Sequence, residues 1–186
     1  MKFPKILLFL FLFQIHDAQL DAYLDYKSPF HPTISENGMV VSQNVQSSEI
    51  GTMILELGGN AVDAAVAVGF SLTTTLPRAG NIGGGGFMLV YIKETEELFS
   101  IDYRSRSSLN SNLEDLFGSK SAAQIQDDDY DLTKYDYKAS AVPGTVYGLL
   151  EAHERFGDLP LEKVLQPVID QARNGIIVSY DLHNAI

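Results

Sequence analysis

Apolar residues recur at the period of a helix in several stretches of the chain. The first stretch is predicted to form a helix that begins at Ser47 or Ser48 and ends at Gly58-Gly59, because serine is a common N-cap and glycine often follows a helix end. Its apolar positions, spaced i, i+3, i+4 and i+7, are Ile50, Met53, Ile54 and Leu57. This spacing indicates a helix with one apolar face.

A second helix is predicted to follow directly. Asn60 is a typical N-cap, and Asp63 lies in the first turn, where a carboxylate meets the positive end of the helix dipole. The body of the helix, residues 61–72, has few polar residues after Asp63, which indicates burial on most sides. The triplet Thr73-Thr74-Thr75 and Pro77 are expected to close it, with the threonine hydroxyls bonding back to helix carbonyls rather than acting as nucleophiles.

Two more helices are predicted nearer the carboxyl terminus. One covers residues 143–156, with its proline in the first position and Gly157 as its stop. The other keeps the helical period over residues 161–175, with Pro167 either kinking it or starting a new helix.

Short apolar segments bounded by turn residues predict three strands, at residues 39–44, 87–92 and 98–103. The charged sequence KETEE between the last two suits an exposed hairpin turn. The run AGNIGGGGF, residues 79–87, leads into this hairpin.

The four consecutive glycines in that run are a poor match to a phosphate-binding loop. Phe87 and Met88 stand where a P-loop has Lys and then Ser or Thr, and a dinucleotide fingerprint needs a helix where this sequence predicts a strand. The glycines instead predict a backbone that turns tightly or approaches another segment closely.

The composition is that of a globular chain, with 186 residues, 45% hydrophobic and 20% charged. A formal net charge of -11 disfavours nucleic acid and anionic membrane surfaces as partners. There is no cysteine, so the chain has neither a disulfide framework nor a thiol nucleophile.

The amino terminus resembles an export signal, because two lysines precede an apolar block over residues 6–13 that is too short to span a bilayer. We expect residues 1–18 to be a signal peptide, residues 19–36 an irregular segment, and residues 37–186 a domain that this chain does not complete, since its last residues read as interrupted. The expected location is outside the cytoplasm, periplasmic or secreted.

Other chemical motifs are incomplete. An acidic surface excursion is predicted over residues 109–139, where Asp127, Asp129 and Asp131 have the spacing of a calcium loop without its glycine and glutamate. The histidines are scattered and form no zinc motif, and His153 is interpreted as a residue on a helix face. No G-x-S-x-G motif is present, and we expect neither a metal nor a cofactor.

Arg104 and Arg106 follow the second strand of the predicted hairpin, where side chains commonly point into a site beside the sheet. A planar guanidinium with five donors suits a carboxylate. The alternative is a pair of surface arginines that bridge to the acidic excursion, and the spacing alone leaves both open.

With these residues assembled, the chain resembles the gamma-glutamyltransferase family, also called gamma-glutamyltranspeptidases or glutathione hydrolases. The resemblance covers roughly residues 37–175 and is carried by NGMVVSQN, GGNAVDAAVA, GNIGGGGF, IDYR and SAVPGTVYGLLEAHERFGDLPLEKVLQPVIDQARNG. It implies an α+β fold, the N-terminal-nucleophile hydrolase sandwich of two sheets between helical layers (αββα). Only the amino-terminal portion of the large subunit is expected in this chain.

The resemblance also implies acyl transfer or hydrolysis of glutathione and related gamma-glutamyl amides. A threonine attacks the amide and forms a covalent acyl-enzyme. In the family this threonine begins a small subunit after self-cleavage of the precursor, and no threonine here matches its motif. We therefore expect no catalytic residue in this chain, and we expect as partners the substrate, the rest of the large subunit and the small subunit, without nucleic acid or a membrane span.

Arg104 matches the family arginine that binds the alpha-carboxylate of the glutamyl group, which makes it the expected substrate-binding residue. The family usually continues with Glu, whereas this sequence has Ser105-Arg106-Ser107-Ser108, so the substrate preference is open. One alternative is a relative of the same fold that acts on beta-lactam side chains or poly-gamma-glutamate. Another is an inactive truncated fragment.

Overall fold

The computed structural model describes residues 33–112, 114, 117–125 and 137–185. The chain divides into two units, residues 1–36 and 37–186, and every helix and strand described below lies in the second. The predicted signal peptide and the aspartates of the excursion lie outside the described residues.

Helix α1 spans Val45–Glu56 and is capped by Asn44, whose Oδ1 accepts hydrogen bonds from Gln46 N at 2.9 Å and Ser47 N at 3.4 Å. The prediction that the helix begins at Ser47 or Ser48 is therefore wrong, because the amide of Asn44 meets the free N–H groups of the first turn. Gly58 has a φ of 88°, which lets the chain turn directly into the next helix.

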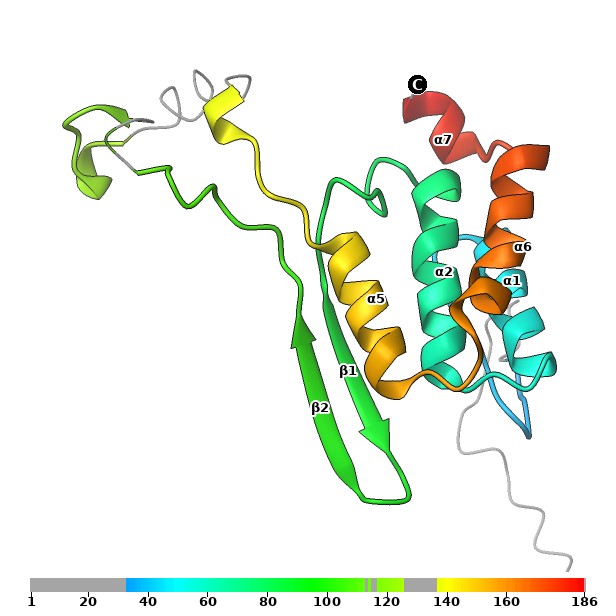
Figure 1. Cartoon of the computed structure of the whole chain (residues 1–186). Helices are drawn as coiled ribbons and strands as arrows, with labels where there is room; N and C mark the ends of the chain where they lie inside the picture. Colours follow the sequence, from blue (N-terminus) through cyan, green and yellow to red (C-terminus); the bar gives the residue numbers. More distant parts are fainter. Residues whose placement is uncertain (1–32, 113, 115–116, 126–136, 186) are drawn as a thin grey trace, which may run out of the picture. The chain divides into compact units, whose positions relative to one another are not determined.

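Helix α2 spans Ala61–Thr75, and its predicted N-cap is confirmed. Asn60 and Asp63 form a capping box, in which each side chain accepts a hydrogen bond from the other end of the first turn. The helix contacts α1, α5 and α6, so it lies at the centre of the helical layer (Figure 1). Its buried residues are Val62, Asp63, Ala64, Val66, Ala67, Val68, Ser71 and Thr75.

A buried cluster of hydroxyl groups joins α1 to α2. Ser47 Oγ lies 2.7 Å from Ser71 Oγ and 2.8 Å from Thr75 Oγ1, and Ser71 Oγ donates to Gln171 Oε1 at 2.7 Å. These contacts explain why serine and threonine are tolerated in an apolar interior. The predicted back-bonding of the threonine triplet is also confirmed, since each hydroxyl reaches a carbonyl of Phe70 or Ser71.

Strands β1, Phe87–Ile92, and β2, Glu97–Asp102, form the predicted antiparallel hairpin, with Val90 opposite Phe99. The strand predicted at residues 39–44 is wrong, because this segment is irregular and pairs with no strand in the part of the chain that the structure describes. A strand is defined by its hydrogen-bonded neighbour, and a local apolar pattern cannot supply one.

Helix α5 spans Thr145–Phe156 and packs against β2, where the Phe99 and Phe156 rings lie 5.0 Å apart. The prediction of Pro143 as its first residue is wrong by two positions, although its end at Gly157 is confirmed. Two short 3-10 helices, η1 at Ala122–Gln124 and η2 at Tyr137–Ala139, lie between β2 and α5.

Helix α6 spans Leu161–Asn174 and contains Pro167 without being divided by it. It is followed by α7, Tyr180–Ala185, which the sequence pattern did not predict.

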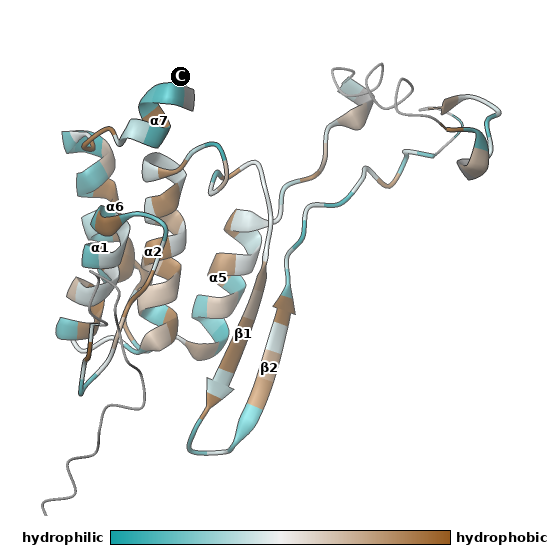
Figure 2. Ribbon diagram, turned by 180° about the vertical axis from the view of Figure 1, so that it is seen from behind, coloured by the Kyte–Doolittle hydropathy of each residue, from teal (hydrophilic) through white to brown (hydrophobic). Residues whose placement is uncertain are grey.

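The hairpin has one covered face and one uncovered face. Figure 2 shows that β1 is largely hydrophobic, and the helices lie on one side of the hairpin in both views. Val90 and Ile101 face the helices and are buried. On the other face the exposed fractions are 68% for Phe87, 72% for Leu89, 60% for Tyr91 and 66% for Leu98. Such a contiguous apolar surface is rare on a monomer.

We predict that the uncovered face limits the solubility of the isolated 186-residue chain. Replacing Leu89 and Tyr91 together by Thr should raise the concentration at which it precipitates and lower its binding of a hydrophobic dye, because threonine keeps the strand propensity. The control is Val90→Thr, on the covered face, which should cost about 1–3 kcal/mol of stability by burying a hydroxyl. An unchanged precipitation point in the double variant would contradict this account.

Candidate functional site

The segment that follows β2 continues the alternation of the strand. From the second half of β2 into this segment, the exposed positions are Ser100, Asp102, Arg104 and Arg106. The buried or half-buried positions are Phe99, Ile101, Tyr103 and Ser105. Because side chains two apart on an extended chain point to the same side, both arginines lie on the outer face of the hairpin and its extension.

The glycine run holds one edge of this segment. Gly86 and Tyr103 exchange backbone hydrogen bonds of 3.3 and 3.0 Å. A Cβ added at Gly85 would lie 2.5 Å from the carbonyl oxygen of Tyr103 and would also meet the backbone nitrogen of Ser105. The predicted close approach of backbone to backbone is therefore confirmed, and it explains why this position is glycine.

The segment that leads into α5 holds the other edge of residues 103–106. Val142 and Arg106 exchange backbone hydrogen bonds of 2.7 and 3.1 Å. The carbonyl oxygen of Gly84 accepts from Gly144 N at 2.8 Å and from Thr145 N at 3.2 Å, so two free N–H groups near the helix start are satisfied by the glycine loop. Residues 103–106 are thus fixed between two other segments.

The Tyr103 side chain packs the segment against α5. Its ring lies directly over Gly148 of α5, where a Cβ would collide with it. Burial raises the pKa of the Tyr103 phenol above its ordinary value, so this side chain stays neutral. The residue therefore contributes apolar packing and no charge to the site.

Among the described residues, the Arg104 guanidinium hydrogen-bonds only to the neighbouring Ser105. Arg104 N donates to Asp102 Oδ1 at 2.9 Å, and Arg104 Nη1 donates to Ser105 Oγ at 2.6 Å. Among the described residues, no carboxylate lies within 4.0 Å of the guanidinium of Arg104 or Arg106. Most of the donors of both groups remain available for an anion.

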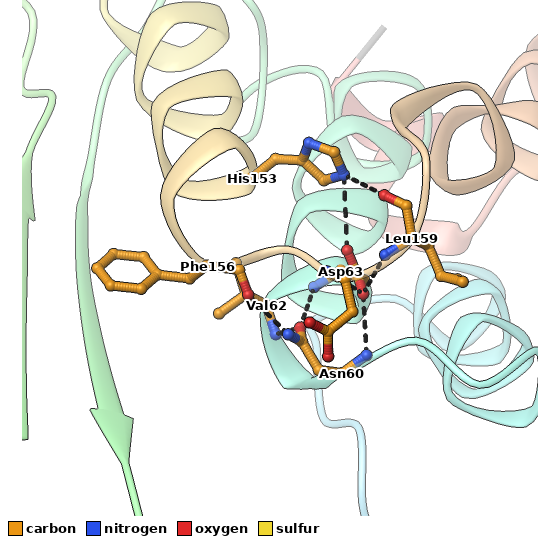
Figure 3. Close-up of polar contacts among 7 residues, drawn as sticks. Asn60, Val62, Asp63, His153, Phe156 and Leu159 are labelled. Atoms are coloured by element: carbon orange, nitrogen blue, oxygen red, sulfur yellow. Dashed lines mark hydrogen bonds and ion pairs between the residues drawn. The ribbon is translucent and has the colours of Figure 1, made fainter. Parts of the chain in front are cut away.

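A second polar cluster joins the start of α2 to the connection between α5 and α6 (Figure 3). The Asp63 side chain is 0% exposed, and its Oδ2 accepts from Asn60 N at 2.9 Å, Asp158 N at 3.1 Å and Leu159 N at 3.2 Å. In addition, Asn60 Nδ2 donates to the carbonyl oxygen of Phe156 at 2.6 Å. One carboxylate thus satisfies a backbone group of its own helix turn and another that lies 95 positions away in sequence.

His153 completes this cluster from α5. Its Nε2 lies 2.9 Å from the carbonyl oxygen of Leu159 and 3.6 Å from Asp63 Oδ1. A carbonyl only accepts, so Nε2 carries the proton. The interpretation of His153 as a simple helix-face residue missed this contact.

A buried Asp–His pair is also found in hydrolase triads, where the second ring nitrogen contacts a nucleophile. Here the same nitrogen, Nε2, faces both Asp63 Oδ1 and the carbonyl oxygen of Leu159, and no hydroxyl group among the described residues is hydrogen-bonded to either ring nitrogen of His153. The cluster therefore fastens α2 to the α5–α6 connection.

Two searches of the described residues concern metal clusters and membrane-spanning helices. Within the ranges that the structure covers, no three His, Asp or Glu side chains gather as a metal site. In the same ranges, every helix is too short or too polar to cross a bilayer.

Comparison with known proteins gives consistent findings. The family model described as gamma-glutamyltranspeptidase matches residues 47–186. The glutathione hydrolase proenzyme of Escherichia coli strain K12 is 43% identical over 150 residues, covering 81% of this chain and 25% of that protein. The acylase ACY 1 proenzyme of Pseudomonas sp. strain V22 is 34% identical over 167 residues, covering 87% of this chain and 29% of that protein.

Among solved structures, the gamma-glutamyltranspeptidase of Helicobacter pylori superposes with a TM-score of 0.73 at 33% identity, covering 83% of this chain and 43% of that one. The chain spans about a quarter of the length of the curated relatives that it matches.

We predict that Gly85→Ala destabilises the chain by about 1–3 kcal/mol, because the added methyl group overlaps backbone atoms that cannot rotate away. The matched control is Gly84→Ala in the same loop, where the nearest atom to a Cβ is 3.5 Å away. Urea denaturation of the two variants measures the difference, and equal stabilities would show that the close approach is not needed.

We also predict that Asp63→Ala lowers the free energy of unfolding by ~3 kcal/mol or more, because it leaves three backbone N–H groups without an acceptor. Asp158→Ala is the control, since it removes an exposed carboxylate of equal charge from the same connection and keeps the backbone N–H. If the two substitutions cost the same in urea denaturation, the fastening role of Asp63 is wrong.

Proposed function

This chain belongs to the gamma-glutamyltranspeptidase family, and on that premise we propose that it is the amino-terminal part of an enzyme that transfers or hydrolyses gamma-glutamyl groups. Its fold class is the predicted one, the amino-terminal portion of an N-terminal-nucleophile hydrolase, represented here by helices over one face of a two-stranded sheet. Glutathione and related gamma-glutamyl amides are the proposed substrates.

The observation that carries this proposal is the placement of Arg104 and the absence of a described carboxylate beside its guanidinium. The side chain is exposed, its backbone is fixed on both sides, and no carboxylate among the described residues neutralises it. A guanidinium on a fixed backbone, with most of its donors free, is suited to bind a carboxylate through two parallel hydrogen bonds. We assign to it the alpha-carboxylate of the glutamyl group.

The nucleophile is proposed to lie outside this chain. The hydroxyls of Thr73, Thr74 and Thr75 are hydrogen-bonded within the helical layer, and Thr145 Oγ1 donates to Asn81 O at 3.2 Å. A threonine supplied by the region that the relatives have in addition would attack the amide carbonyl, release the amine and form an acyl-enzyme. Water or an acceptor amine would then take the acyl group.

Several features of the whole protein follow as part of this proposal. The relatives are named proenzymes, which fits a precursor that cleaves itself into a large and a small subunit. Residues 37–186 would form the amino-terminal part of the large subunit. Residues 1–18 would direct export to the periplasm or the medium.

An acylase of the same fold is the second candidate. It is favoured by the relative named acylase ACY 1 and by Ser105, which stands where the family usually has a glutamate. A change at the residue that contacts Arg104 Nη1 alters the immediate surroundings of the substrate carboxylate. Assaying the complete enzyme with a gamma-glutamyl anilide and with a beta-lactam that carries an acyl side chain separates the two candidates.

We predict that Arg104→Lys, made in the complete enzyme that contains this chain, lowers kcat/KM for a gamma-glutamyl anilide. The expected loss of transition-state stabilisation is ~1.5 to 3 kcal/mol. Lysine keeps the charge but loses the planar pair of donors, and this figure is the scale of a hydrogen bond to a charged group. Self-cleavage should be spared, because the precursor reacts with its own peptide bond.

The control for this experiment is Arg173→Lys, the same substitution at an exposed arginine in the last turn of α6. It should leave kcat/KM unchanged. Normal kinetics in Arg104→Lys would remove Arg104 from the site.

A further inference from the structure

Arg106 is a second arginine on the face that carries Arg104. Both residues occupy exposed positions of one extended segment, two apart, with the half-buried Ser105 between them. The rise along a strand places their Cα atoms about 6.6 Å apart. The two backbone hydrogen bonds between Arg106 and Val142 fix this spacing without using the arginine side chain.

The positive charge of this pair is not neutralised by the described residues. Within the part of the chain that the structure describes, no carboxylate lies within 4.0 Å of either guanidinium, although the whole chain has 24 acidic residues for 13 basic ones. Asp102 lies on the same face, but its Oδ1 accepts from Arg104 N. Ser105, which accepts from Arg104 Nη1, brings no charge.

Two positive side chains that leave one face of the segment this close together repel each other, and an anion that meets both removes the repulsion. A ligand with two carboxylates fits better than one with a single carboxylate, because each guanidinium then forms its own charge-assisted hydrogen bonds.

We propose that Arg106 is a specificity-determining residue that binds a second carboxylate, located on the amine side of the gamma-glutamyl amide. The proposal rests on the proposed function, in which Arg104 binds the alpha-carboxylate. The preferred substrates are then gamma-glutamyl amino acids, whose leaving amine carries a carboxylate close to the amide that is cut. Amides of neutral amines are poorer substrates.

The test uses two chromogenic substrates that differ by one carboxylate, gamma-glutamyl-4-nitroanilide and gamma-glutamyl-3-carboxy-4-nitroanilide, with the complete enzyme. The quantity measured is the ratio of kcat/KM for the carboxylated substrate to that for the neutral one. In Arg106→Gln this ratio should fall about tenfold, the loss expected when a hydrogen-bonded charge is removed. In Arg104→Lys both rates should fall together and the ratio should persist.

Two further variants make the result specific. Arg106→Lys keeps the charge and should retain part of the preference, which a loss of folding would not. Arg173→Gln removes an exposed positive charge from α6 and should leave the ratio unchanged, so a general effect of net charge is recognised. A ratio in Arg106→Gln equal to that of the wild type overturns the proposal.

Failure of the proposed function is distinguished by a binding experiment. If the wild-type enzyme turns over neither anilide, the proposed function is wrong. The preference for a second carboxylate is then measured by calorimetry, as the ratio of the dissociation constants of gamma-glutamylmethylamide and gamma-glutamylglycine. A preference for gamma-glutamylglycine that Arg106→Gln abolishes supports the two-carboxylate site. An equal affinity of the wild-type protein for the two ligands overturns it.

Discussion

The close approach of the glycine loop to the segment after β2 is the constraint on which the candidate site depends. Gly85 lies so near the backbone of Tyr103 and Ser105 that no side chain fits between them, and the carbonyl of Gly84 is held by the start of α5. The segment therefore cannot relax toward solvent without breaking hydrogen bonds on both edges. This rigidity matters because a long arginine side chain binds well only when its backbone is already placed.

The helical layer keeps α5 itself in place. At its first turn α5 is held by Gly84, and just past its last turn Asp63 accepts hydrogen bonds from Asp158 and Leu159. Burying a carboxylate is costly, and the three backbone donors to Oδ2 offset part of that cost. The Asp63 cluster thus acts on the arginine site indirectly, by fixing the helix that supports it.

The parts of this fold that were predictable from sequence are those decided by neighbouring residues. The capping box at Asn60, the hairpin and the threonine back-bonding depend on contacts within a few positions. The contact between Asp63 and His153 joins residues ninety positions apart, and no local sequence pattern predicts it. Residues 39–44 have a strand-like pattern without a partner strand in the described chain. Arg104 was singled out by its place after a strand and by the family resemblance. That no described carboxylate pairs with its guanidinium emerged only in three dimensions.

The most direct test of this account is a crystal structure of the complete enzyme with bound L-glutamate, the product of hydrolysis and the smallest molecule that carries the alpha-carboxylate. The account predicts that both oxygens of this carboxylate lie within hydrogen-bond distance of the Arg104 guanidinium, with residues 103–106 unmoved between the glycine loop and Val142. Glutamate bound at another place, with Arg104 in contact only with solvent, would contradict it.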